Sequence, residues 1–227
     1  MSRPNKERNN MIERQPEPEL MDDPLEAEAY SETDFSDVNE KFAAEFSTFL
    51  PLSGELIMLD LGCGPGDITY RVYQRFEDCK IIGLDGSPSM LQFAQKRYGI
   101  RKLQWILGDA KALPFPDQSV DVIISNSLLH HLADPKPLWL ETKRILKPGG
   151  YVFIRDLFRP ESTEKAWEII ETYVSDASNL LREEYYRSLL SAFTPEEICK
   201  QLEECGLQNL TVKCVTDRHV DIYGTLE

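Results

Sequence analysis

Short apolar runs alternate with stretches in which apolar residues recur at helical spacing over most of the chain. Short apolar runs bounded by turn-forming residues are typical of buried strands. Five such runs lie at 56–61, 80–85, 103–110, 120–126 and 151–157. Helical patterns follow the first, second and fourth runs, at 67–76, 87–98 and 134–150. Strands joined through helices predict a parallel sheet that is covered on both faces.

The segment before the first strand has a different pattern. Residues 1–21 are polar and charged and have no apolar face, so we expect a mobile acidic or polar tail. Residues 22–50 predict a helical lid, because apolar residues recur at helical spacing behind a cap at Ser36 or Asp37. These apolar residues are Val38, Phe42, Phe46, Phe49 and Leu50.

Residues 51–227 are expected to form the main domain, with a helical insertion at about 161–193 that either packs on the domain or forms part of a lid. The chain ends with QNLTVKCV and HVDIYGTL, which predict an antiparallel hairpin at the edge of the sheet. The whole pattern predicts an α/β fold with a doubly wound, seven-stranded and mostly parallel sheet.

The stretch LDLGCGPGD, residues 59–67, places glycines at every second position directly behind the first strand. A strand that leads through a glycine-rich turn into a helix aims backbone N–H groups at a ligand. Dinucleotides and S-adenosylmethionine both bind to this arrangement. The dinucleotide fingerprint needs glycine or alanine at its sixth position, which is Asp67 when counted from Gly62. A carboxylate there would repel a pyrophosphate.

The chain from Leu56 to Phe158 resembles the class I S-adenosylmethionine-dependent methyltransferases, in particular their small-molecule, type 11-like branch. Asp60 to Gly66 match the D-x-G-x-G-x-G signature of that family. The resemblance implies a Rossmann-like fold, S-adenosylmethionine as the cofactor, and one set of cofactor-binding residues. These are Asp60, Gly62, Gly64, Gly66, Asp85, Gly86, Ser87, Met90, Asp109, Ala110 and Asn126.

Within this set, the resemblance implies that Asp85 accepts hydrogen bonds from the ribose hydroxyls. Asp109 would accept the adenine amino group, and the Ala110 amide would meet the ring. Gly86, Ser87 and Met90 would flank the adenine. Two structural alternatives stay open: Asp109 caps a turn, and Met90 is an ordinary core residue.

His130 and His131 follow the fourth strand, at the carboxyl end of the sheet where ligands bind in open α/β folds. The resemblance implies that His130 faces the methyl acceptor, as in phosphoethanolamine-type methyltransferases that pair it with an N-terminal tyrosine. We expect His130 to be a base or an orienting group, with Tyr30 as its partner. Two alternatives stay open: His130 is a hydrogen-bonded structural histidine, and Tyr30 is a surface aromatic on an amphipathic helix. Arg155 and Asp156 end the fifth strand and are candidates for binding a charged acceptor, or for an ion pair without a catalytic part.

Composition narrows the classes of partner. The formal net charge of −14 disfavours a phosphate backbone or an anionic membrane. Asn126 is followed by Ser-Leu-Leu and not by the Pro-Pro-aromatic tripeptide of enzymes that methylate nucleic-acid bases. The five cysteines form no C-x-x-C pair, and no apolar leader or membrane span is seen, so we expect a cytoplasmic protein with reduced thiols. We also expect no metal site, and a monomer or homodimer.

These observations predict methyl transfer from S-adenosylmethionine to a small-molecule acceptor, with release of S-adenosylhomocysteine. The accepting atom is oxygen, nitrogen, carbon or sulfur, and the sequence does not decide among them. A regulatory protein that binds the cofactor without catalysis is an alternative. A nucleotide-dependent oxidoreductase is a third possibility, which Asp67 disfavours.

Overall fold

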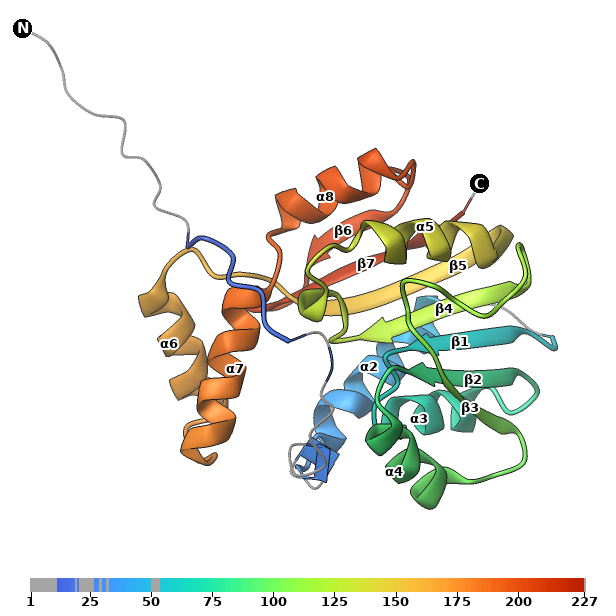
Figure 1. Ribbon diagram of the computed structural model, residues 1–227, viewed down its shortest axis with the longest axis horizontal. Helices are drawn as coiled ribbons and strands as arrows, with labels where there is room; N and C mark the ends of the chain where they lie inside the picture. Colours follow the sequence, from blue (N-terminus) through green and yellow to red (C-terminus); the bar gives the residue numbers. More distant parts are fainter. Residues whose placement is uncertain are drawn as a thin grey trace, which may run out of the picture.

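The computed structural model describes residues 12–18, 20, 27–28, 30–31, 33–49 and 54–226. Its centre is a seven-stranded sheet in the order β3-β2-β1-β4-β5-β7-β6 (Figure 1). The strands are β1 (Ile57–Leu61), β2 (Lys80–Asp85), β3 (Leu103–Leu107), β4 (Val120–Asn126), β5 (Leu146–Leu157), β6 (Thr211–Cys214) and β7 (His219–Thr225).

The first five strands are parallel, and β7 and β6 form an antiparallel hairpin at one edge. This arrangement confirms the predicted α/β fold with its mostly parallel sheet and C-terminal hairpin.

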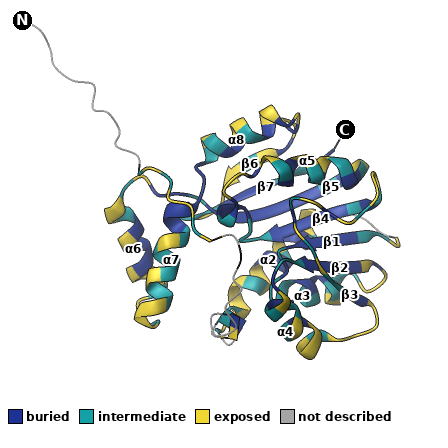
Figure 2. Cartoon of the chain, in the orientation of Figure 1, coloured by how far each residue is buried: buried dark blue, intermediate teal, exposed yellow. Residues whose placement is uncertain are grey.

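Helices cover both faces of the sheet (Figure 1). They are α2 (Ser36–Phe49), α3 (Asp67–Arg75), α4 (Pro88–Tyr98), α5 (Lys136–Ile145), α6 (Thr163–Tyr173), α7 (Asn179–Ser191) and α8 (Pro195–Glu204). One core cluster joins the sheet to α5 and α8, and a second joins the opposite face to α2 and α3. The central strands are accordingly largely buried (Figure 2).

Alternation along the strands decides which core each side chain enters. In β1, Met58 belongs to the core beneath α2 and α3, whereas Leu59 and Leu61 belong to the core beneath α5 and α8. In β5, Phe153 and Ile154 divide in the same way. Consecutive residues at the end of β5 therefore point to opposite faces of the sheet.

Local capping signals define several helix starts. Ser87 caps α4 by accepting a hydrogen bond from the Met90 amide, and Pro88 opens the helix. Thr194 and Glu197 form a capping box at α8. The helical pattern at 134–150 differs from the structure, because α5 ends at Ile145 and Leu146 pairs with Val120 in the sheet. Strand pairing there replaces the last predicted turns of the helix.

Helices α6 and α7 form a separate unit beyond one end of the sheet (Figure 1). Ala166, Ile169 and Ile170 of α6 pack on Leu189 of α7 and on Leu157 at the end of β5. Each helix begins with a serine cap, Ser162 for α6 and Ser178 for α7. These two helices occupy the segment for which the sequence predicted an insertion.

Residues 12–18, which we name the N-terminal strap, lie against α7 and the turn after β4. The Gln15 amide donates to the Leu190 carbonyl (3.1 Å). The Arg14 guanidinium donates to the carbonyls of Ser191 (2.5 Å) and Leu132 (2.7 Å), and it stacks on the Phe193 ring. Residues 12–18 belong to the mobile tail expected for 1–21, of which residues 1–11, 19 and 21 lie outside the described residues.

Substitution of two glycines in the β1–α3 loop should lower the stability of the fold by different amounts. Both have positive φ, +52° at Gly64 and +85° at Gly66. A Cβ at Gly66 would lie 2.6 Å from the Trp105 ring, whereas a Cβ at Gly64 would meet no atom within 4 Å. We expect Gly66→Ala to lower the free energy of unfolding by about 2–4 kcal/mol and Gly64→Ala by about 1 kcal/mol, measured by urea unfolding. Equal losses would contradict this account of the loop.

Candidate cofactor and acceptor site

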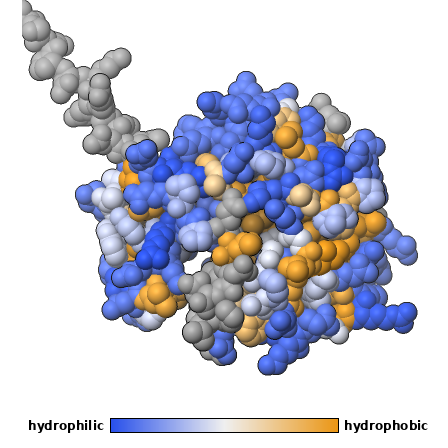
Figure 3. Space-filling view, in the orientation of Figure 1, coloured by the Kyte–Doolittle hydropathy of each residue, from blue (hydrophilic) through white to orange (hydrophobic). Residues whose placement is uncertain are grey.

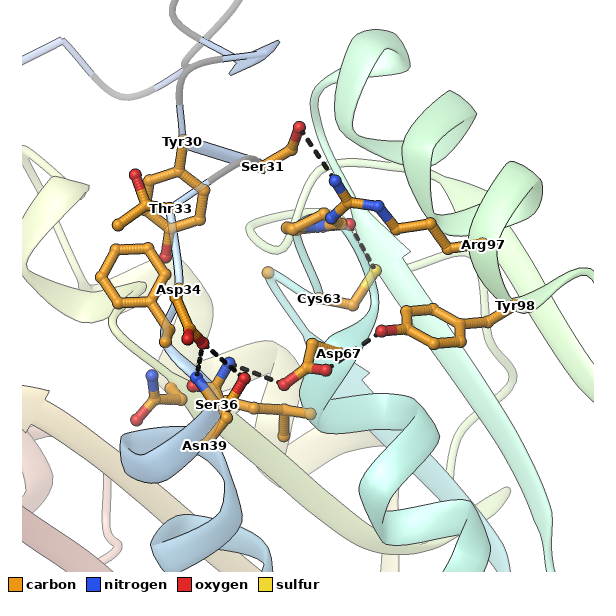
Figure 4. Close-up of a pocket in the computed structure, with 16 residues that line it drawn as sticks. Tyr30, Ser31, Thr33, Asp34, Ser36, Asn39, Cys63, Asp67, Arg97 and Tyr98 are labelled. Atoms are coloured by element: carbon orange, nitrogen blue, oxygen red, sulfur yellow. Dashed lines mark hydrogen bonds between the residues drawn. The ribbon is translucent and has the colours of Figure 1, made fainter.

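A cavity of about 440 Å³ opens over the glycine loop. Figure 4 shows Tyr30 on one side of this cavity and Arg97 and Tyr98 on the other, with Asp67 and Asn39 at its base. The glycine loop contributes Gly62, Cys63, Gly64 and Pro65, and β4 contributes Asn126. Residues from the N-terminal segment, the first strand and the fourth strand therefore meet at one place.

Asp85 links the end of β2 to the glycine loop. The Gly64 amide donates to Asp85 Oδ2 (2.8 Å), and the Ser87 amide donates to Oδ1 (2.8 Å). Burial raises the pKa of Tyr30, and the charge of Asp85 raises it further. Tyr30 lines the same cavity as Gly62 and Gly64, which brings the N-terminal segment onto the loop.

Asp67 holds the base of the cavity together. Its Oδ2 accepts hydrogen bonds from Asn39 Nδ2 (2.9 Å) and Arg71 Nε (2.7 Å), and its Oδ1 accepts one from the Tyr98 hydroxyl (3.0 Å). These partners come from α2, α3 and α4. Burial and the Asp67 charge raise the pKa of Tyr98 to about 12, so the phenol stays protonated and donates to the carboxylate.

Asp60 has a different environment from the other acids of the signature. It is buried in β1, and its Oδ2 accepts a hydrogen bond from the Thr69 hydroxyl (2.6 Å). Burial raises the pKa of Asp60 to about 7, although the bond from Thr69 opposes the shift. Asp60 thus joins β1 to α3, and it is not among the residues that line the cavity.

The residues predicted to surround adenine are not among those that line the cavity. Asp109 Oδ1 accepts a hydrogen bond from the Lys111 amide (2.8 Å), so this carboxylate caps a turn, and Met90 is buried. A Cβ at Gly86 would lie 2.6 Å from the Leu20 side chain, so Leu20 covers Gly86. In this conformation Asp109 thus caps a turn and Met90 is a buried residue, as the two structural alternatives proposed.

His130 and Asp156 form a buried pair at the ends of β4 and β5. His130 Nδ1 lies 2.6 Å from Asp156 Oδ1, and the Leu129 amide donates to Asp156 Oδ2 (2.6 Å). Burial disfavours the charged imidazole, but Asp156 outweighs it and raises the pKa of His130. Burial likewise opposes ionisation of Asp156, but His130 outweighs it and lowers the pKa of that carboxyl. The acid thus fixes the ring and favours its protonated form.

Glu17 of the N-terminal strap faces both histidines. Its Oε1 lies 3.1 Å from His131 Nδ1 and 3.5 Å from His130 Nε2. The Ser188 hydroxyl of α7 donates to Glu17 Oε1 (3.2 Å), and burial raises the pKa of Glu17. Burial and the neighbouring His130 lower the pKa of His131 to about 3.

Arg155 is not brought to this group. Its guanidinium donates to both carboxylate oxygens of Asp221 in β7 (2.6 Å each) and pairs with Glu45 of α2. Adjacent strand residues face opposite sides of the sheet, so Asp156 reaches His130 while Arg155 packs beneath α2. The structure thus gives Arg155 the ion pair that the sequence left open as an alternative.

Comparisons with known proteins identify the family. A family model described as a methyltransferase domain matches residues 59–154. A demethylmenaquinone methyltransferase from Thermotoga maritima is 30% identical over 161 residues, which cover 66% of this chain and 69% of that protein. The chain therefore belongs to the class I S-adenosylmethionine-dependent methyltransferases. This membership removes the nucleotide-dependent oxidoreductase as an alternative.

Other methyltransferases agree with this assignment. A trans-aconitate 2-methyltransferase from Methylobacterium radiotolerans is 37% identical over 123 residues, which cover 54% of this chain and 46% of that protein. The fold matches a putative S-adenosylmethionine-dependent methyltransferase from Methanococcus maripaludis with a TM-score of 0.70, at 21% identity and over 100% of this chain and 98% of that one. The chain spans about half the length of several curated methyltransferases that it matches. No helix among the described residues is long and apolar enough to cross a membrane.

The residues present fit the cofactor of this methyltransferase family. Gly64 has open space where a side chain would stand, and the cavity extends over it. Asp85 supplies a carboxylate at the end of β2 beside this loop. Asn126 and Asp67 add polar groups at the cavity wall, near the place expected for an amino acid end. The face seen in Figure 3 is largely hydrophilic, with patches of apolar side chains.

Several residues of the methyltransferase site carried no recognisable signal in the sequence. Glu17 and Asn39 reach the site from the N-terminal segment, and Arg97 and Tyr98 reach it from the end of α4. None belongs to the glycine signature. Asp67 was the exception, because its position directly after the glycines placed a carboxylate at the start of α3.

The first test of the candidate site is the replacement of Asp85. Asp85→Ala should weaken S-adenosylhomocysteine binding by about 1–3 kcal/mol, because the carboxylate is lost and the Gly64 amide loses its acceptor. Calorimetric titration measures this change, with Asp176→Asn on the surface as the control variant. Unchanged affinity in Asp85→Ala would remove Asp85 from the site.

Asp60 predicts a dependence of stability on pH. Since its folded pKa is about 7 against an ordinary value of 3.8, it contributes stability below pH 4 that is lost as the pH rises to about 7. Asp60→Asn keeps an acceptor for Thr69 and cannot ionise. The variant should therefore lose less unfolding free energy than the wild type between pH 5 and pH 8, measured by urea unfolding at both values. An equal loss would mean that Asp60 is already ionised at pH 5.

Proposed function

We propose that this protein transfers the methyl group of S-adenosylmethionine to a small-molecule acceptor and releases S-adenosylhomocysteine. The observation that carries the proposal is the meeting of two features at one edge of the sheet. A cavity lies over a glycine loop that leaves room for a ligand. A buried pair, His130 and Asp156, lies at the ends of β4 and β5. The first feature suits the cofactor, and the second suits an acceptor that must be oriented or deprotonated.

When bound, the cofactor supplies a methyl group on a sulfonium, which is already a good leaving group. The chain mainly has to align the acceptor and exclude water. Tyr30 and Phe35, whose ring centroids lie 5.1 Å apart, form an aromatic wall on the N-terminal side of the cavity. Arg97 donates to the Ser31 hydroxyl (3.4 Å) and ties this wall to α4.

His130 is our candidate for the general base. Its Nδ1–H donates to Asp156, so Nε2 is the nitrogen that can take a proton from an acceptor. Tyr30 acts on the cofactor side in this account, because it lines the cavity over the glycine loop. The names of the matched relatives cover chemically different acceptors, so they leave the acceptor of this chain open between oxygen, nitrogen, carbon and sulfur nucleophiles.

Calorimetric titration with S-adenosylmethionine, S-adenosylhomocysteine and NADH tests the cofactor part of the proposal. We expect micromolar binding of the first two ligands and no binding of NADH. Release of S-adenosylhomocysteine is then followed across a panel of carboxylate, phenol, amine and thiol acceptors. Cofactor binding without turnover on any acceptor would favour a regulatory protein, in which Glu17 covers Nε2 of His130.

Replacement of His130 should lower turnover without changing cofactor binding. His130→Ala should lower kcat by about 10²–10⁴-fold while cofactor affinity stays nearly unchanged, because the ring lies outside the cavity over the loop. His219→Ala is the matched control, since His219 lies on β7 and contacts Thr216. Retained activity in His130→Ala would show that the acceptor needs no base.

Asp156 predicts a shift of the pH–rate profile. Because Asp156 raises the pKa of His130, wild-type activity should rise with pH as His130 loses its proton. In Asp156→Asn this rise should move to lower pH, and kcat at its plateau should fall because the ring is less well oriented. A profile that does not move would mean that His130 does not titrate in the reaction.

A further inference from the structure

Glu17, His130 and His131 bring three metal-ligating atoms into one small volume. One ligand atom from each of the three side chains lies within 4.8 Å of the other two. Two of the separations are 3.1 Å and 3.5 Å. Ligands held about 2.1 Å from a tetrahedral zinc ion lie about 3.4 Å apart, so these two edges already have the required length. Only the edge between the two histidines has to adjust.

The groups behind the ligands are also arranged for a metal ion. Metal-binding histidines almost always hydrogen-bond through their other ring nitrogen or are otherwise oriented by a carboxylate or carbonyl. His130 Nδ1 contacts Asp156 at 2.6 Å, which directs Nε2 toward Glu17. The Pro18 carbonyl hydrogen-bonds to His131, and the Ser188 hydroxyl orients Glu17.

The orientation of His130 suits a shared ion. With Nδ1 held by Asp156, the ring directs Nε2 toward Glu17, and a neutral imidazole offers its lone pair there. One divalent ion can contact a ligand atom from each of the three side chains.

We propose that Glu17, His130 and His131 form a binding site for a divalent transition metal of the zinc type. Two imidazoles and one carboxylate match the ligand set of open zinc sites, whereas Mg²⁺ and Ca²⁺ prefer oxygen ligands. The side chain of His131 is 25% exposed and gives the ion a path from solvent. The sequence did not predict this site, because Glu17 lies far from the histidines along the chain.

A metal ion there would fasten the N-terminal strap onto the acceptor side of the molecule. Glu17 belongs to the strap, and both histidines belong to the turn after β4. The ion therefore joins two segments that Arg14 also joins, through the carbonyls of His130 and Leu132. The ion would also occupy Nε2 of His130, the nitrogen assigned to the base. This last consequence depends on the proposed function, whereas metal binding itself does not.

Calorimetric titration of the full chain with Zn²⁺, after removal of metals with a chelator, tests the proposal. Cys199 and Cys214 are exposed and could bind Zn²⁺, so all variants carry serine at both positions. We expect one equivalent to bind, and Glu17→Gln and His131→Asn each to weaken binding by at least about tenfold. His219→Asn, which removes a histidine outside the cluster, should bind as the parent does. Mg²⁺ should not compete.

Equal Zn²⁺ affinity in all of these variants, or no binding at micromolar concentration, would overturn the proposal. Circular dichroism and thermal unfolding of the metal-free variants confirm that each has folded before it is titrated. Hydrogen exchange provides the second readout, since Zn²⁺ should slow exchange of the Gln15 amide in the parent but not in Glu17→Gln. Zn²⁺ binding that leaves this amide unprotected would overturn the link between the metal and the strap. Neither readout requires methyl transfer, so failure here is distinguishable from failure of the proposed function.

Discussion

Parallel pairing of β1 with both β2 and β4 is the constraint on which the site depends. In the observed register, Leu61 is level with Leu84 on one side and with Ser125 on the other. The next residues, Gly62, Asp85 and Asn126, therefore leave the sheet at the same edge and at the same level. Parallel strands deliver their carboxyl ends together, and the strand order reverses between β1 and β4, which opens a crevice there. The loop glycines then keep side chains out of that crevice.

Much of this arrangement could be predicted from the sequence. Continuous apolar runs between helical patterns are enough to predict a parallel sheet, and the capping signals at Ser87 and Thr194 define helix starts through local hydrogen bonds. The signature around Gly62 and Gly64 and the acid at Asp85 follow from the same logic, because each lies directly after a strand. For His130 and Asp156, the sequence predicted only that both lie at the same edge of the sheet, and it did not predict that they pair.

Other features depend on contacts between distant segments, which a local pattern does not record. The end of α5 was misplaced because Leu146 gains a strand partner in Val120 that helical periodicity cannot indicate. Arg155 and Asp156 are neighbours in sequence, but only the alternation along a strand of known register separates their roles. The strap was missed because Arg14 and Glu17 are held by backbone carbonyls, a serine and histidines that belong to other elements.

A crystal structure of the protein with S-adenosylhomocysteine tests the central claim most directly, namely that the space above the glycine loop is a cofactor site. The account predicts the amino acid end of the ligand over Gly62–Gly66 within the cavity, and the ribose hydroxyls within hydrogen-bonding distance of the Asp85 carboxylate. Leu20 would have to leave Gly86 if adenine lies where the family resemblance implies. A ligand bound away from the loop, or one that makes no contact with Asp85, would contradict the account.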